Sequence, residues 1–179
     1  MTSRDGLTFK RWGEALIRPG LSRTDSWVYG DNIISWGILP TKSGLPRSPQ
    51  ELSIFVTESY WTGKSQFFRR YSMRLDGFVS LAASLRGGEF VTKPLKFRGS
   101  KLVINYSTSA AGGVWVEIQD TQGRPLKGYT QSDCHEIFGD EVQREVRWKK
   151  SDDVSSLSSQ PVRLRFVFKD ANLYSFRFR

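Results

Sequence analysis

The sequence predicts an all-β protein, an antiparallel β-sandwich of jelly-roll type preceded by an irregular segment that also contains β-structure. Two observations support this class. Short stretches alternate apolar and polar residues or are rich in β-branched and aromatic ones, as strands with one buried face are. Turn signals with Gly or Pro separate them at the 8–12-residue spacing typical of sandwiches and barrels. The predicted strands are Glu51–Trp61, Lys101–Thr108, Val114–Asp120, Glu141–Trp148 and Val162–Asp170.

The first third of the chain differs in composition and in its lack of strand patterns. Residues 5–44 hold several tryptophans and many glycines but few clean strand patterns, and Lys42–Gln50 is a loop dense in Pro, Gly and Ser. We expect Arg69–Ser84 to connect this part of the chain to the second region. We therefore expect two parts, a loop-rich segment over 1–68 and a β-sandwich domain over 69–179. The one mildly helical stretch, Asp152–Gln160, is expected to form a single turn, because its serines compete for backbone hydrogen bonds.

Alternation along each predicted strand selects the side chains of the sandwich core. A register error of one residue would move them to the outer face. The expected core is Phe78, Val79, Leu95, Phe97, Leu102, Ile104, Val114, Val116, Ile118, Val146, Trp148, Leu164, Phe166, Phe168, Tyr174 and Phe176.

The composition of the chain argues against several classes of protein. Aromatic residues make up 13% of the chain, which fits a folded protein. No apolar run approaches the roughly 20 residues of a membrane span, so no membrane partner is expected. The start, MTSRDGLTFKRW, lacks the apolar stretch of a signal peptide, which makes the cytoplasm the default location. A single cysteine cannot form an internal disulfide.

The net charge of +9 raises the possibility of nucleic-acid binding, but its distribution argues against it. Residues 1–75 hold 11 basic and 6 acidic side chains, and residues 76–179 hold 16 and 12, so the excess is spread evenly. A phosphate-binding face more often forms a cluster or stripe. The densest groups, Arg69–Arg74 and Arg147–Lys150, lie beside strand-like segments where basic residues form a solvated face. Nucleic acid is therefore an unfavoured partner.

The stretch Ser132–Glu141, SDCHEIFGDE, holds the only cysteine and the only histidine among four carboxylates. Cys134 and His135 are adjacent, so in a strand they face opposite ways, which excludes a zinc site and a thiol–imidazole pair. The carboxylates do not follow an EF-hand spacing. We expect no metal and no cofactor, and the candidates to test for an ion are Asp133, Glu136 and Asp140.

The plainer interpretation of this stretch is a loop that closes one end of the sandwich. Ile137 and Phe138 would pack inward and Gly139 would permit a turn. Cys134 would then be partly buried, and His135 replaceable.

A second candidate site is aromatic. Flat apolar rings mixed with polar groups bind sugar rings by stacking and hydrogen bonding. The alternative is that these rings pack the first segment against the sandwich. The candidate carbohydrate-binding residues are Trp27, Tyr29, Trp36, Tyr60 and Trp61, with the carboxylates of Asp31 and Glu58 nearby in sequence.

Much of the chain resembles a known arrangement. Asp76–Leu81, Gly87–Asp120, the loop through IFGDE and VRWK, and Gln160–Phe178 look like the C-terminal β-sandwich of bacterial glycosidase-like proteins. In those proteins the sandwich follows a five-bladed β-propeller related to fructan and arabinan hydrolases. Arg4–Gly20, Trp27–Asn32 and Glu51–Gly63 resemble the end of that propeller, which would make residues 1–68 a propeller remnant.

This resemblance implies a protein without catalysis. Glycoside hydrolysis needs two carboxyl groups flanking the bond, and the Asn-Asp-Pro, Arg-Asp-Pro and Glu-Cys type motifs of the related enzymes are absent here. We expect an accessory module that stabilises a protein or binds an oligosaccharide or polysaccharide. The alternatives are a residual glycoside hydrolase, with Asp31 and Glu58 as the carboxylates to test, and a basic nucleic-acid-binding domain. A lone blade would also expose sheet edges, so residues 1–68 are candidates for self-association or for binding a partner chain.

Overall fold

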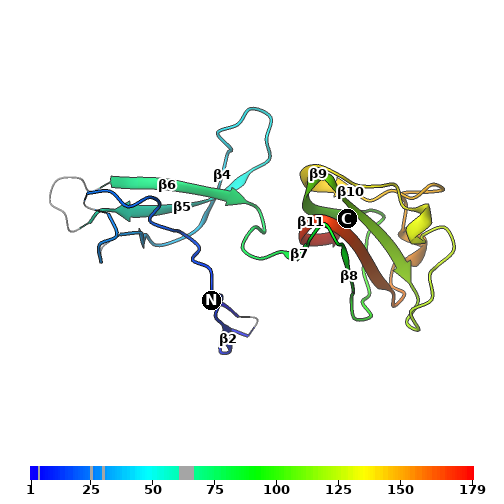
Figure 1. Ribbon diagram of the computed structural model, residues 1–179. Helices are drawn as coiled ribbons and strands as arrows, with labels where there is room; N and C mark the ends of the chain where they lie inside the picture. Colours follow the sequence, from blue (N-terminus) through cyan, green and yellow to red (C-terminus); the bar gives the residue numbers. More distant parts are fainter. Residues whose placement is uncertain (4, 25, 30, 61–66) are drawn as a thin grey trace. The chain divides into compact units, whose positions relative to one another are not determined.

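A computed structural model describes the whole chain except residues 4, 25, 30 and 61–66. The chain divides into two compact units, Met1–Met73 and Arg74–Arg179 (Figure 1). Almost all regular structure in the described residues is antiparallel β-sheet, which confirms the predicted all-β, sandwich-like class. None of the described residues forms a helix long and apolar enough to cross a membrane.

The first unit is built around one strand. β5 (Glu51–Glu58) pairs with β3 (Ile33–Ile34), β4 (Leu39–Thr41) and β6 (Phe67–Arg74). β1 (Thr2–Ser3) and β2 (Phe9–Lys10) form a separate two-stranded ribbon. The sequence predicted β5 but treated Arg69–Ser84 as a passage between regions, whereas residues 67–74 extend as a strand beside β5.

Burial in the first unit is sparse. Among its described apolar side chains, only those of Ile54 and Val56 are buried. The rings of Phe55 and Phe68 stack with their centroids 5.5 Å apart, yet Phe68 remains exposed. The described part of this unit therefore has no extended apolar core.

The second unit is a curled sheet in the order β10-β9-β11-β7. Its strands are β7 (Leu81–Ala83), β8 (Gly88–Val91), β9 (Leu102–Gln119), β10 (Asp140–Glu145) and β11 (Arg163–Phe178), with β8 also paired to β11. β9 unites two of the predicted strands, since β11 runs beside it from Gln119 to Leu102. Two 3₁₀ turns, η1 (Gln131–Asp133) and η2 (Ser155–Leu157), interrupt the connections, and η2 confirms the single turn predicted within 152–160.

The concave side of the curled sheet carries the core. Alternation along β9 and β11 buries the predicted residues from Val114 to Ile118 and from Leu164 to Phe168, and the predicted Leu95 and Phe176 pack against them. The Trp148 indole N–H donates to the carbonyl of Val116 at 2.9 Å, so the one polar atom of this buried ring has a partner. The buried core comprises Phe97, Leu102, Ile104, Tyr106, Val114, Val116, Ile118, Cys134, Ile137, Val146, Trp148, Val154, Val162, Leu164, Phe166, Phe168, Ala171 and Leu173.

Three predicted core residues are wrong. Phe78 and Val79 are 44% and 39% exposed, because they lie in the turn before β7 rather than in a strand. Tyr174 is only partly buried. The pairing of β11 with β9 shifts between Lys169 and Ala171, so the alternation changes phase and Leu173 occupies the core in place of Tyr174.

A glycine lies where the pairing of β9 with β11 is irregular, between Lys169 and Ala171 of β11. A Cβ atom at Gly112 would lie 2.4 Å from the carbonyl oxygen of Asp170 and 2.8 Å from that of Lys169. The backbones of β9 and β11 can therefore approach this closely only with no side chain at position 112.

We expect Gly112→Ala to lower the free energy of unfolding by about 1–3 kcal/mol, the usual cost of forcing atoms into a packed site. Urea denaturation followed by tryptophan fluorescence measures the change. Gly88→Ala is the control, because its methyl group would meet only the Cβ of Ala83, at 3.4 Å. Equal stability of the two variants would contradict this account of the close approach at Gly112.

Candidate functional site

The outer face of the curled sheet carries a row of polar side chains beside one indole ring. The alternation that buries Val114, Val116 and Ile118 places Trp115, Glu117 and Gln119 on the opposite face of β9. β11 pairs with β9 so that Arg165 lies directly across from Glu117, and Arg163 across from Gln119. The strand register therefore creates this set of neighbours.

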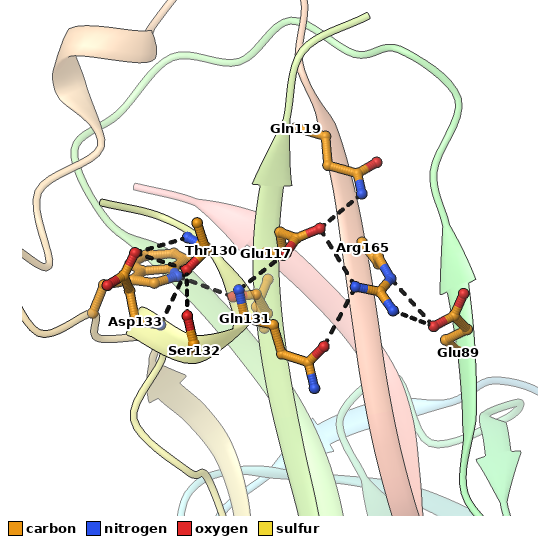
Figure 2. A network of polar contacts seen from close by, with 10 residues as sticks. Glu89, Glu117, Gln119, Thr130, Gln131, Ser132, Asp133 and Arg165 are labelled. Atoms are coloured by element: carbon orange, nitrogen blue, oxygen red, sulfur yellow. Dashed lines mark hydrogen bonds and ion pairs between the residues drawn. The ribbon is translucent and has the colours of Figure 1, made fainter. Parts of the chain in front are cut away.

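Arg165 joins two carboxylates from different strands. Figure 2 shows its guanidinium between Glu117 of β9 and Glu89 of β8. Nη2 lies 2.5 Å from Glu89 Oε2, and Nη1 lies 3.5 Å from Glu117 Oε1. The hydrogen bond to Glu89, followed by the charges of Glu89 and Glu117, raises the pKa of Arg165. The positive charge is thus permanent and shared between the two acids.

Glu117 is only 5% exposed and accepts hydrogen bonds at both oxygens. The Gln119 side-chain amide donates to Oε1 at 2.8 Å, and the backbone N–H of Gln131 donates to Oε2 at 3.1 Å. Arg165 also donates to the side-chain oxygen of Gln131, at 3.3 Å. Both oxygens of this carboxylate therefore accept hydrogen bonds within the protein, and a cation lies beside it.

The turn η1 fixes Gln131 over this carboxylate. Thr130 and Asp133 form a capping box, in which the N–H of Asp133 donates to Thr130 Oγ1 at 3.3 Å and the N–H of Thr130 donates to Asp133 Oδ2 at 3.3 Å. The side-chain hydrogen bond from Thr130 lowers the pKa of Asp133. Figure 2 shows the turn beside Glu117, so its backbone is part of the polar network.

A hollow of about 430 Å³ opens beside the network. The indole of Trp115 is half-buried and lies against Gly113, where an added Cβ would come within 2.7 Å of its Cη2 atom. The hollow thus combines an aromatic ring held in place with polar groups already fixed by hydrogen bonds. Its lining is Trp115, Glu117, Thr130, Gln131, Ser132 and Cys134.

The loop over 132–141 differs in part from its prediction. Cys134 is buried and Ile137 packs in the core, while Gly139 has φ +108°. Phe138, predicted to pack inward, is 67% exposed, because the bridge between Val114 and Ile137 places Ile137 inside and its neighbour outside. His135 is exposed, and its backbone N–H donates to the carbonyl of Arg147.

The three candidate ion ligands do not form a group. Asp133 bonds to Thr130, Asp140 lies 2.7 Å from Arg74 Nη1, and Glu136 is exposed. Within the described part of the chain, no three His, Cys, Asp or Glu side chains converge as a metal site would require. Each carboxylate has a local environment of its own, and none of these environments gathers ligands for an ion.

Four of the predicted aromatic residues lie at exposed positions in the first unit. Trp36 is fully exposed, Tyr29 nearly so, and Trp27 and Tyr60 are exposed to a smaller degree. Trp61 lies outside the described residues. Whether these rings bind sugars stays a prediction.

The two candidate catalytic carboxylates of the first unit have structural partners. Asp31 accepts the backbone N–H groups of Trp27 at 2.5 Å and Ser59 at 2.7 Å. Glu58 is buried, accepts a hydrogen bond from the Tyr71 hydroxyl and lies 3.0 Å from Arg69 Nε. The bond to Glu58 raises the pKa of Tyr71. Both acids thus connect segments of the first unit.

Sequence reasoning missed the network on the outer face. The alternation in VWVEIQ, residues 114–119, already places a Trp, a Glu and a Gln on one face of a strand. The pattern does not give the register between strands, and this register places Arg165 opposite Glu117. Gln131, which belongs to a loop, carries no periodic signal.

Comparison with known proteins gives no relative. No family model, no curated protein and no solved structure matches the chain. The functional argument therefore depends on the residues and their geometry.

We expect Arg165→Met to destabilise the second unit by about 2–4 kcal/mol, because it leaves the buried Glu117 carboxylate without its cation. Urea denaturation measures the loss, and adding Glu117→Gln should restore most of it. Arg124→Met is the control, since Arg124 pairs with Asp120 at an exposed position where an ion pair contributes about 1 kcal/mol or less. Failure of the double variant to recover stability would show that the ion pair does not explain the loss.

We expect Cys134 to be unreactive in the folded protein. Burial raises the pKa of its thiol to about 11, and the thiolate is the reactive form. At pH 8, a soluble aromatic disulfide reagent should modify it at least about 100-fold more slowly in buffer than in 8 M urea, given the thiolate fraction and the lack of access. Comparable rates in the two solvents would place the thiol at the surface.

Proposed function

We propose that the chain is a non-catalytic carbohydrate-binding module and that a saccharide binds in the hollow beside Trp115. The observation that carries this proposal is the hydrogen-bonded network of Glu117, Arg165 and Gln131 next to the indole of Trp115. A sugar ring presents an apolar face to an aromatic ring and hydroxyl groups to fixed polar atoms. Because the polar groups are already held in place, a ligand would lose little free energy in ordering them.

The chemistry of the same residues argues against turnover at this site. A glycosidase needs one carboxylic acid that delivers a proton and one carboxylate that acts as nucleophile or base. Glu117 accepts hydrogen bonds at both oxygens, and Glu89 is ion-paired with the same guanidinium. Neither group is placed to deliver a proton, so the proposal is binding without hydrolysis.

An accessory sandwich without catalysis, the role expected from the sequence, agrees with this proposal. A residual hydrolase built on Asp31 and Glu58 gains little support, since both carboxylates hold backbone or side-chain donors of the first unit. Nucleic-acid binding also gains little, since Arg165 is balanced by Glu89 and Glu117 at the centre of the outer face. A purely stabilising module, the other role expected from the sequence, is the alternative to this proposal.

Titration calorimetry with fructan, arabinan, xylan and sialylated oligosaccharides tests the proposal. We expect at least one saccharide to bind. Trp115→Ala should weaken the affinity for it about 10-fold, because that change corresponds to the free energy of one stacking contact. Phe9→Ala is the control, because this ring is exposed in the other unit and belongs to neither candidate site. Circular dichroism should show that both variants remain folded.

Two results would contradict the proposal. If none of the four classes binds, carbohydrate recognition fails altogether. If a saccharide binds and Trp115→Ala has no more effect than Phe9→Ala, the hollow beside Trp115 is not the site.

A further inference from the structure

Trp27 in the first unit is held in a backbone conformation that large side chains rarely adopt. Its φ is +61°, in the left-handed region where a bulky residue is an outlier. Such a conformation costs about 1–3 kcal/mol and persists only where surrounding contacts impose it. A glycine would occupy this position without strain, so the presence of tryptophan calls for a separate reason.

The contact that imposes this conformation comes from Asp31. One carboxylate oxygen accepts the backbone N–H of Trp27 at 2.5 Å, and the other accepts the backbone N–H of Ser59 at 2.7 Å. Ser59 follows directly after β5, so a single side chain connects the Trp27 turn to the end of the central strand. Asp31 is therefore a positioning residue for this turn.

The indole ring is oriented as well as its backbone. Its Nε1–H donates to the carbonyl of Gly20 at 3.1 Å, which uses the only hydrogen-bonding group of the ring. The side chain nevertheless stays 62% exposed. The turn thus presents an apolar aromatic surface to solvent in a fixed orientation.

The ring borders an open depression of about 700 Å³. Gly13, Ala15, Pro19, Gly20 and Leu21 also line it, and most of these have small side chains or none. Glu14 and Arg18 also line it, and within the described residues neither forms an ion pair. Their charged groups are free to exchange hydrogen bonds with a ligand's hydroxyl groups.

We propose that this depression is a second saccharide site, in which a sugar ring stacks on the indole of Trp27 and its hydroxyl groups bind Glu14 and Arg18. The inference rests on the carbohydrate-binding function proposed above and adds a site in the other unit. Two sites on one chain raise the overall affinity for a long polysaccharide when both can engage the same molecule, without any new contact. A short oligosaccharide would instead occupy the two sites independently.

The test uses the full chain and Trp27→Gly, which removes the ring and suits the positive φ, so the fold is expected to survive. Calorimetry with the short oligosaccharide that the wild type binds should give a stoichiometry of two. Trp27→Gly should leave one site, with the affinity of the Trp115 site unchanged. In the ¹H–¹⁵N spectrum, the indole resonance lost in Trp27→Gly should be one that shifts on titration of the wild type.

Phe9→Ala is the matched control, since its ring is also exposed in the first unit but lines no part of the depression. It should keep both sites. A wild-type stoichiometry of one that Trp27→Gly leaves unchanged would overturn the second site and leave the proposed function standing. Absence of binding by every saccharide tested would overturn both.

Discussion

The pairing of β9 with β11 is the constraint on which the second unit depends. It runs from Arg163 opposite Gln119 to Phe178 opposite Leu102, and it is the longest pairing in the chain. Its register decides both faces of the sheet at once: one face buries Val116 against Phe166 and the other sets Glu117 against Arg165. Slipping the register by one residue would bury an ion pair and expose the core, so packing and the polar network favour the same alignment.

The alternation of apolar residues was enough to predict most of this fold. The strands β9 and β10, the first half of β11 and most of the core positions on them follow from the period of two, because each strand has one buried face. The short strands β7 and β8 were not predicted. The errors occur where the period breaks. Tyr174 lies beyond a shift in the pairing of β11, and Phe78 lies in a turn that only resembles the start of a strand. Neither the shift in pairing nor the turn can be predicted from the hydrophobic pattern alone.

The candidate site was harder to predict for a physical reason. Glu117 and Arg165 are 48 positions apart, and only the paired backbone shows that they are neighbours. The tryptophans of the first unit were conspicuous in the sequence, yet their contacts depend on loops without periodicity.

The first unit also differs from the second in how few apolar side chains it buries. With Ile54 and Val56 as its only buried apolar side chains among the described residues, it has much exposed apolar surface, and self-association through residues 1–68 stays a prediction that this surface favours.

The burial of Cys134 has a practical consequence. The only thiol of the chain lies within the core, where its sulfur accepts the N–H of Val116 and donates to the carbonyl of His135. A cysteine introduced at any exposed position would therefore be the only one that a thiol-directed dye or spin label could reach. The natural sequence thus serves as a single-label background, and a pair of such positions, one in each unit, would allow the distance between the two units to be measured in solution.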